Sequence, residues 1–315
     1  MAKIKSIFKQ IPIVTWFVLL MIIVFSFCSK QYLTLRNMRI LLQQGSVLLV
    51  VASAATFIII SGGLDLSLGG ILTLSGVFVA IAVNAGLPII LVILIGALSG
   101  FLCGAFNGVI ISYCGLQPFI VTLGTQGIFY GCALAATNRV GIQVSDEKFL
   151  TLGGLINGKI PMAFICCFVL YLFAIFVQNR TRLGRYVYVI GGNSEGGRLS
   201  GINIKFWKWL TYSFAGMLTG LAAVVLVSRL EVADPLVGSK WEFEAIAATI
   251  IGGTSMNIGK GNVIGTIIGV ALLTVLRSGM NVIRIPSIWQ PAIIGIVIIM
   301  AIVFQVSIAS KEIKK

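Results

Sequence analysis

The chain has 315 residues, of which 58% are hydrophobic and 10% charged, with no histidine and a formal net charge of +14. Soluble domains carry about 25% charged residues, so a mean hydropathy of +1.06 excludes an ordinary water-soluble protein. The cations lie in short segments between apolar runs, which argues against a nucleic-acid-binding patch. Without histidine, a histidine metal site is excluded, and we expect no metal or cofactor on this chain.

A helix that crosses the hydrocarbon core of a bilayer needs about 20 apolar residues. The sequence predicts an all-α integral membrane protein, a single domain over 1–315 with about ten transmembrane helices, some of them short or broken. The predicted spans are approximately 11–28, 41–61, 67–85, 88–112, 118–136, 161–178, 209–228, 244–258, 262–281 and 288–308.

Lysine and arginine set the predicted orientation, because cytoplasmic loops carry an excess of both. Basic clusters lie in the N-terminal tail, in the stretch about 179–208 and in the C-terminal tail. Six predicted crossings separate the N-terminal tail from the stretch 179–208, and ten separate it from the C-terminal tail. Both numbers are even, so all three clusters lie on one side, and both termini are predicted to be cytoplasmic. The stretch about 138–160 then lies outside, and so do six of the nine acids, Glu242 and Glu244 among them.

The first polar motif is Ser-Gly-Gly-Leu-Asp-Leu-Ser-Leu-Gly-Gly at 61–70. Its acid, Asp65, stands between two apolar runs, and a charge inside a bilayer costs upwards of about 2.5 kcal/mol unless it faces a cavity or a partner. The flanking glycines allow a helix to break there. Asp65 and Ser67 are therefore candidates for a translocation pathway. Asp65 either caps a helix that begins at Leu66 or contacts the solute.

Glycines recur at four-residue spacing in three of the predicted helices. Small residues on one helix face let two backbones approach closely within a membrane. The repeats therefore predict tight helix packing at Gly96, Gly100, Gly104 and Gly108, at Gly216 and Gly220, and at Gly261, Gly265 and Gly269.

A second polar motif follows Pro118, which favours the first turn of a helix. Thr122 and Gln126 are four residues apart and share a helix face, with Thr125 beside them. Their neutral hydroxyl and amide groups suit a polyol better than an ion, and this makes them pathway candidates. The alternative is that the hydroxyls bond to their own helix backbone.

The stretch 181–202 mixes basic, aromatic and glycine-rich pieces. A short helix at about 193–200, bounded by glycines, is predicted to dock into a groove on a partner. The alternative is that its charge only fixes the topology.

A third polar element, at 252–259, shares the Gly-Gly-x5-Gly spacing of the first and adds Thr254, Ser255 and Asn257 to the pathway candidates. The adjoining Gly253 to Gly261 segment differs from a phosphate-binding loop, which needs four residues between its glycines and Ser or Thr after the lysine. We therefore expect no catalytic residues here, and ATP hydrolysis on a separate chain.

Taken together, four stretches resemble the permease subunits of bacterial ribose-type carbohydrate ABC importers. They are Ser-Gly-Gly-Leu-Asp-Leu-Ser-Leu-Gly-Gly at 61–70, Pro-Phe-Ile-Val-Thr-Leu-Gly-Thr at 118–125, Thr-Arg-Leu-Gly-Arg-Tyr with Gly-Gly-Asn and Arg-Leu-Ser-Gly-Ile within 181–202, and Ile-Gly-Gly-Thr-Ser with Gly-Lys-Gly within 251–261. One departure is Gly196-Gly197, where the family commonly has small apolar residues.

The resemblance implies a multi-pass protein of the bacterial inner membrane that pairs with a second permease, identical or not. Two ATPase domains, holding ATP and Mg, would dock on the 179–208 segment, and an extracytoplasmic binding protein would deliver a ribose-like sugar. The resemblance gives the candidate ATPase-contact residues as Arg182, Arg185, Asn193, Glu195, Arg198 and Ser200. A nucleoside or a sugar-like signal molecule stays open as the solute. An ion-coupled secondary transporter is the rival mechanism, and it would need paired ionisable groups within the membrane.

Overall fold

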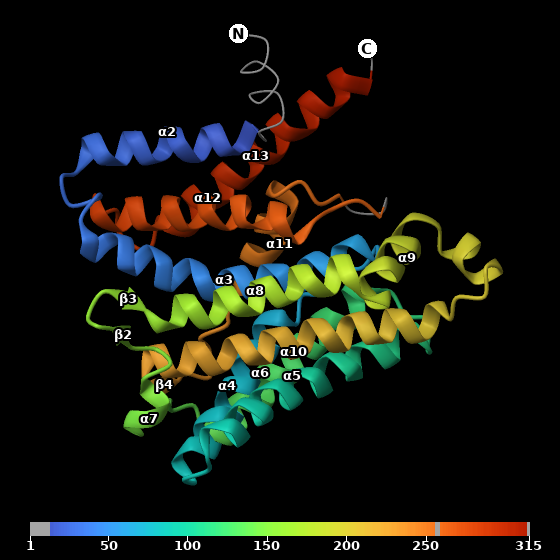
Figure 1. The fold of residues 1–315 in the computed structure, drawn as a ribbon, viewed down its shortest axis with the longest axis horizontal. Helices are drawn as coiled ribbons and strands as arrows, with labels where there is room; N and C mark the ends of the chain where they lie inside the picture. Colours follow the sequence, from blue (N-terminus) through green and yellow to red (C-terminus); the bar gives the residue numbers. More distant parts are fainter. Residues whose placement is uncertain (1–12, 256–258, 314–315) are drawn as a thin grey trace.

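The computed structural model describes residues 13–255 and 259–313, and it is mostly helical (Figure 1). The helices are α2 (Ile13–Cys28), α3 (Leu35–Ile60), α4 (Leu68–Asn84), α5 (Ile89–Ser112), α6 (Pro118–Thr137), α7 (Glu147–Leu150), α8 (Met162–Arg180), α9 (Arg182–Leu199), α10 (Ile204–Leu230), α11 (Trp241–Ile251), α12 (Val263–Val282) and α13 (Gln290–Ile313). The strands are β1 (Ile142–Gln143), β2 (Leu155–Ile156), β3 (Ile160–Pro161) and β4 (Val232–Ala233).

Every predicted span overlaps a helix, but the helices differ in length. Within the described residues, six helices are long and apolar enough to cross a membrane: α3, α5, α6, α8, α10 and α12. Shorter apolar helices are found at Val14–Cys28, Leu68–Asn84 and Gln290–Met300.

The span predicted at 244–258 differs most from the structure. The helix there, α11, has 11 residues, or about 16 Å at 1.5 Å per residue, which is half the hydrocarbon thickness. It ends at Ile251 because Gly252 and Gly253 follow, and Gly253 has a φ of +95° that only glycine adopts readily.

The long helices run roughly along one direction, with α3 and α10 in the centre (Figure 1). α3 packs against α8, α10, α11 and α12, and α10 packs against α3, α4 and α5. α2 and α13 contact α12 on one flank, while α5 and α6 contact α4 on the other. Most of α3 and α10 is buried, whereas α5 and α6 keep exposed apolar faces.

Helices α5 and α10 are in contact through their backbones. A Cβ on Gly100 would overlap the carbonyl oxygen of Gly216, and one on Gly220 would overlap that of Gly96. The opposite face of α5 is exposed and apolar, with Leu94 and Leu98 more than half exposed. The glycine prediction is confirmed for this pair. It also holds for Gly269, which packs on Ala248 of α11, and for Gly265, which packs on Gly252 directly after α11. Gly261 precedes α12 and lies outside that helix.

The two ends of the bundle differ in structure. At one end α9 projects beyond the other helices, and its Gly191 packs on the carbonyl group of Ile60, where α3 ends (Figure 1). At the other end β1 pairs antiparallel with β4, with Ile142 opposite Ala233, and β2 pairs with β3. The stretch 138–160 therefore forms short ordered pieces that pack over the ends of α4 and α10.

Candidate functional site

The break between α3 and α4 places the first polar motif inside the bundle. α3 ends at Ile60, Gly62 follows with a φ of +75°, and α4 begins at Leu68. The predicted helix start at Leu66 is therefore two residues early. The segment is buried between α5, α6 and α10, since it bonds to Asn107 and Thr122 and its Gly63 packs on the hydroxyl group of Tyr212.

Asp65 is 2% exposed, and its side chain bonds to Ser67, the N-cap residue, rather than to a backbone N–H group within α4. Its Oδ1 accepts hydrogen bonds from the Ser67 backbone N–H at 2.7 Å and from the Ser67 hydroxyl at 2.6 Å. Ser67 Oγ in turn accepts one from Asn107 Nδ2 on α5 at 2.7 Å. The second carboxyl oxygen, Oδ2, is buried without a partner among the described residues. Asp65 thus fixes the N-cap residue of α4, and one of its oxygens stays available.

The threonines of α6 support this break. Thr122 Oγ1 accepts a hydrogen bond from the Leu66 N–H at 3.1 Å and donates to the Pro118 carbonyl at 2.9 Å. Thr125 is 4% exposed and donates to the Thr122 carbonyl at 3.3 Å. Both hydroxyls therefore bond to backbone groups, which is the second of the two alternatives that the sequence left open.

Gln126 and Glu242 form a second polar pair in the bundle. Gln126 Nε2 donates to Glu242 Oε1 at 2.7 Å, and Glu242 is 2% exposed. Glu242, which the sequence analysis places on the outer side, is buried within the bundle because the chain after β4 turns back inward. Gly238 packs on Gly69 of α4, and its N–H donates to Thr73 Oγ1 at 3.0 Å.

Glu242 lies in the first turn of α11, where the helix dipole favours a negative charge. Its free oxygen, Oε2, and the hydroxyl group of Tyr130 both face the Cα of Gly69. Both atoms are buried and lack partners among the described residues. Two buried acids, Asp65 and Glu242, therefore flank the first turn of α4, each with one unpaired oxygen.

The third polar element does not join these pairs. Thr254 is 1% exposed and its side chain lies against Gly261, while Ser255 forms a backbone bridge with Lys260. No hydrogen bond in the described part of the chain connects either residue to Asp65 or to Gln126. The predicted pathway residue Asn257 lies outside the described residues.

The basic segment 179–208 is more helical than its glycines suggest. Thr181 is the single residue between α8 and α9 and caps the start of α9, since its Oγ1 accepts a hydrogen bond from the Gly184 N–H. Asn193, with φ −154° and ψ 84°, breaks α9 and then caps its last part, since its Oδ1 accepts from the Gly196 N–H at 2.8 Å. Gly201, with a φ of +81°, ends this last part, which lies within the predicted helix 193–200.

The tip of α9, residues 193–200, is exposed and carries four of the predicted contact residues, while Arg182 and Arg185 lie in the first turn of the helix. Arg198 pairs with Glu195 at 2.5 Å, and their side chains are 66% and 64% exposed. The hydrogen bonds from Arg198 lower the pKa of Glu195, so this ion pair is charged at neutral pH. Arg182, Arg185 and Ser200 are exposed as well. The tip thus offers donors, an acceptor and the 76% exposed side chain of Leu199 to a partner.

Comparison with known proteins assigns the fold to a family. The model of the family described as "Branched-chain amino acid transport system / permease component" matches residues 37–302. The chain belongs to this family of transport-system permease components.

Several curated relatives align over nearly the whole chain. D-allose transport system permease protein AlsC of Escherichia coli is 35% identical over 291 residues, which are 91% of this chain and 89% of the relative. Ribose import permease protein RbsC of Bacillus subtilis is 35% identical, with 91% and 89% covered. Galactose/methyl galactoside import permease protein MglC of Escherichia coli is 34% identical, with 90% of each chain covered. No solved structure matches the chain.

Proposed function

We propose that the chain is the permease subunit of an ABC importer that moves a small, ribose-like sugar across the bacterial inner membrane without changing it chemically. The observation that carries this proposal is that the chain matches sugar import permeases over about nine tenths of both lengths. The polar layer around α4 supports it, since buried hydroxyl, amide and carboxyl groups are those that bind a polyol.

The proposed orientation puts α9 and both termini in the cytoplasm. The basic residues of the 179–208 segment support it under the positive-inside rule. α2 begins and α13 ends toward the same end of the bundle as α9 (Figure 1). In this arrangement the chain has ten membrane-embedded helices, of which α11 reaches only part of the way across.

The proposed pathway runs beside the first turn of α4. The unpaired oxygens of Asp65 and Glu242 would accept hydrogen bonds from solute hydroxyls, with Ser67, Thr122, Thr125 and Gln126 holding the surrounding backbone and side chains in place. Neutral solutes with several hydroxyl groups fit this arrangement, and nucleosides or sugar-like signal molecules are the alternatives to a ribose-like sugar. Ion coupling is the rival mechanism, because two buried acids are present.

The proposed partners follow from the exposed tip of α9 and from the transport class. A cytoplasmic ATPase, which holds ATP and Mg, would receive the part of α9 after Asn193. A second permease copy or homologue would complete the pathway, and an extracytoplasmic binding protein would deliver the sugar at the opposite end.

Reconstitution tests the proposal. The chain is placed in liposomes with its ATPase and binding protein, and uptake of labelled D-ribose, D-allose, D-galactose and a nucleoside is measured. We expect uptake of one sugar with ATP, none with a non-hydrolysable analogue, and no change when an ionophore collapses the proton gradient. Uptake that follows the ion gradient without ATP would establish secondary transport instead.

A further inference from the structure

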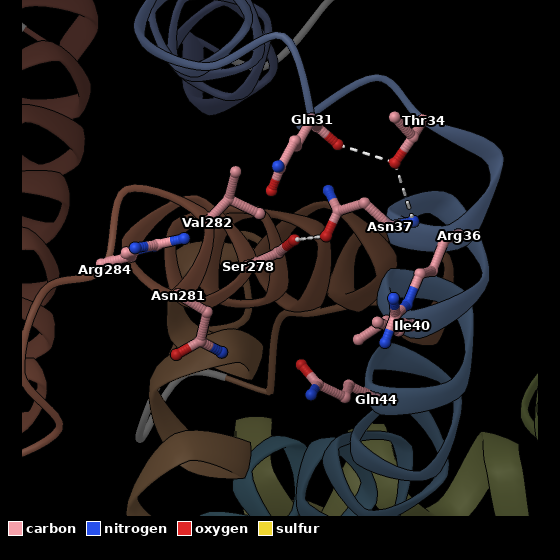
Figure 2. Close-up of a pocket in the computed structure, with 10 residues that line it drawn as sticks. All are labelled: Gln31, Thr34, Arg36, Asn37, Ile40, Gln44, Ser278, Asn281, Val282 and Arg284. Carbon is pink, nitrogen blue, oxygen red and sulfur yellow. Dashed lines mark hydrogen bonds between the residues drawn. The ribbon is translucent and has the colours of Figure 1, made fainter.

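A polar cavity of about 500 Å³ opens at the end of the bundle opposite α9. It lies between the start of α3, the loop before α3 and the end of α12 (Figure 2). Its lining is mostly polar, with only Ile40 and Val282 apolar, and the groups that matter for its chemistry are Gln31, Arg36, Asn37, Gln44, Asn281 and Arg284.

Two arginines give the cavity its charge. Arg36 on α3 and Arg284 after α12 lie on opposite sides of it (Figure 2). Both are exposed, and within the described part of the chain neither guanidinium group makes a hydrogen bond or an ion pair. None of the lining residues is acidic. Two arginines outside the cavity differ, since Arg277 pairs with Glu244 and Arg229 donates to the Gln43 carbonyl, whereas the Nε of Arg39 on α3 has no partner in the described structure.

The cavity wall is held in place by buried contacts. Asn37 is 7% exposed, accepts a hydrogen bond from Ser278 on α12 at 3.0 Å and donates to the Tyr32 carbonyl at 2.7 Å. Gln290 fixes Asn281 through a 2.8 Å hydrogen bond. The Oε1 atom of Gln44 is buried without a partner in the described structure. These contacts hold a cavity whose two arginines carry a charge of +2 that no acidic lining residue offsets.

We propose that this cavity binds carboxylate side chains of the extracytoplasmic binding protein when that protein docks on the permease. The proposal rests on the proposed function, which places this end of the bundle outside the cell. Guanidinium groups bind carboxylates through paired hydrogen bonds, and the surrounding amides can satisfy the remaining oxygens. Two unpaired positive charges also accelerate the approach of an acidic surface.

Other ligands fit the cavity less well. A neutral sugar would leave both guanidinium charges without a counter-charge. An anionic lipid would place its phosphate between the arginines, but Ile40 and Val282 give its acyl chains little apolar wall inside the cavity. A carboxylate on a protein surface needs no such wall.

The test measures docking on the assembled permease–ATPase complex in phosphatidylcholine nanodiscs. The variant replaces both arginines, Arg36→Gln with Arg284→Gln, and the control is Lys159→Gln, an exposed lysine at the same end of the molecule and outside the cavity. We expect the double variant to raise the Kd of the binding protein by about tenfold or more. We expect the control to leave the Kd unchanged and both variants to keep the basal ATPase rate.

Salt dependence gives a second measurement that needs no double variant. The affinity of the wild-type complex should fall as salt rises, because salt screens exposed charges, and each single variant should show a weaker dependence. Arg36→Glu and Arg284→Glu should weaken docking further than the glutamine variants.

Two results would overturn the inference. One is a double variant that docks with wild-type affinity and wild-type salt dependence. The other is a double variant that docks normally but loses a thermal stabilisation that phosphatidylglycerol gives the wild type, because the cavity then binds a lipid. If the wild-type complex docks no binding protein and imports no sugar, the proposed function fails, and this result is separate from both.

Discussion

Gln126 on α6 donates a hydrogen bond of 2.7 Å to Glu242 on α11, although 116 residues separate them in the chain. This contact joins the short helix α11 to α6, which has an exposed apolar face. It also gives a buried carboxyl group one of its few partners, because the other Glu242 oxygen has none among the described residues.

The first prediction concerns this pair. Gln126→Leu removes the donor and leaves a buried acid unsatisfied, so it should lower the free energy of unfolding by about 1–3 kcal/mol. Glu242→Gln keeps an oxygen that can accept the bond and should cost less. The thermal midpoint in detergent measures both, and a Gln126→Leu protein as stable as the wild type would show that the pair contributes nothing.

The second prediction concerns Asp65 and the start of α4. Asp65→Asn retains an oxygen for the Ser67 N–H and hydroxyl, whereas Asp65→Leu removes the acceptor of both bonds. At roughly 1 kcal/mol for each hydrogen bond, Asp65→Leu should lower the free energy of unfolding by about 2 kcal/mol. Asp65→Asn should fold normally. Its sugar uptake then reports whether the negative charge itself serves transport, since equal uptake would assign Asp65 a structural role alone.

The third prediction concerns the α5–α10 contact. Gly100→Val places a side chain against the backbone of α10, and overpacking of this kind costs about 1–3 kcal/mol. Gly127→Ala on α6 is the matched control, because nothing lies within 4 Å of its Cβ position. We expect the Gly100 variant to unfold at a lower temperature and the Gly127 variant to match or exceed the wild type. Equal stability of the two variants would contradict the close approach of α5 and α10.

The fourth prediction concerns the tip of α9. Asn193→Ala removes the cap on the Gly196 N–H, which costs about 1 kcal/mol locally and should loosen the last part of the helix. ATP-driven uptake should fall several-fold while membrane insertion is kept, and deletion of 193–200 should abolish uptake. If the deletion variant still transports sugar, this segment is not the part of the chain that couples it to the ATPase.

The exposed ion pair between Glu195 and Arg198 gives a separate prediction, which concerns stability rather than uptake. Its lowered Glu195 pKa means that its contribution is complete above the usual pKa of a glutamate and is lost only as the pH falls through the lowered value. Because both groups are exposed, the pair contributes little to stability. Glu195→Gln should therefore leave the thermal midpoint near that of the wild type at neutral pH.

Much of the helical framework could be predicted, because apolar runs between polar motifs locate helices whatever their partners are. The helix break at 61–67 and the short helix within 193–200 could also be predicted, since both follow from local residue types. The inward turn at 234–241 could not, because its polar residues look like an ordinary outside loop. Only its contact with Gly69 and Thr73, more than 160 positions earlier, shows where it lies.

The residues that sequence analysis missed share one property. Asn107, Tyr212 and Glu242 are buried residues with polar groups, within or beside apolar runs. The hydrogen-bond partners of Asn107 and Glu242 come from distant parts of the chain, and the Tyr212 hydroxyl packs on Gly63. The sequence did contain a signal for Asn107. It lies between Gly104 and Gly108, and an amide so close to a glycine face is expected to contact a neighbouring helix rather than lipid. The partner itself, Ser67, depends on tertiary packing that no local pattern encodes.

The direct backbone contact between α5 and α10 has a consequence for motion. Where two helices touch through glycines, no side chain lies between them that could change rotamer when their spacing changes. We therefore expect α5 and α10 to move together as one unit. In the transport cycle proposed above, we expect the rearrangements that open the pathway to either face of the membrane to occur in the helices around this pair. The glycine spacing is then expected to mark the part of the protein that moves least.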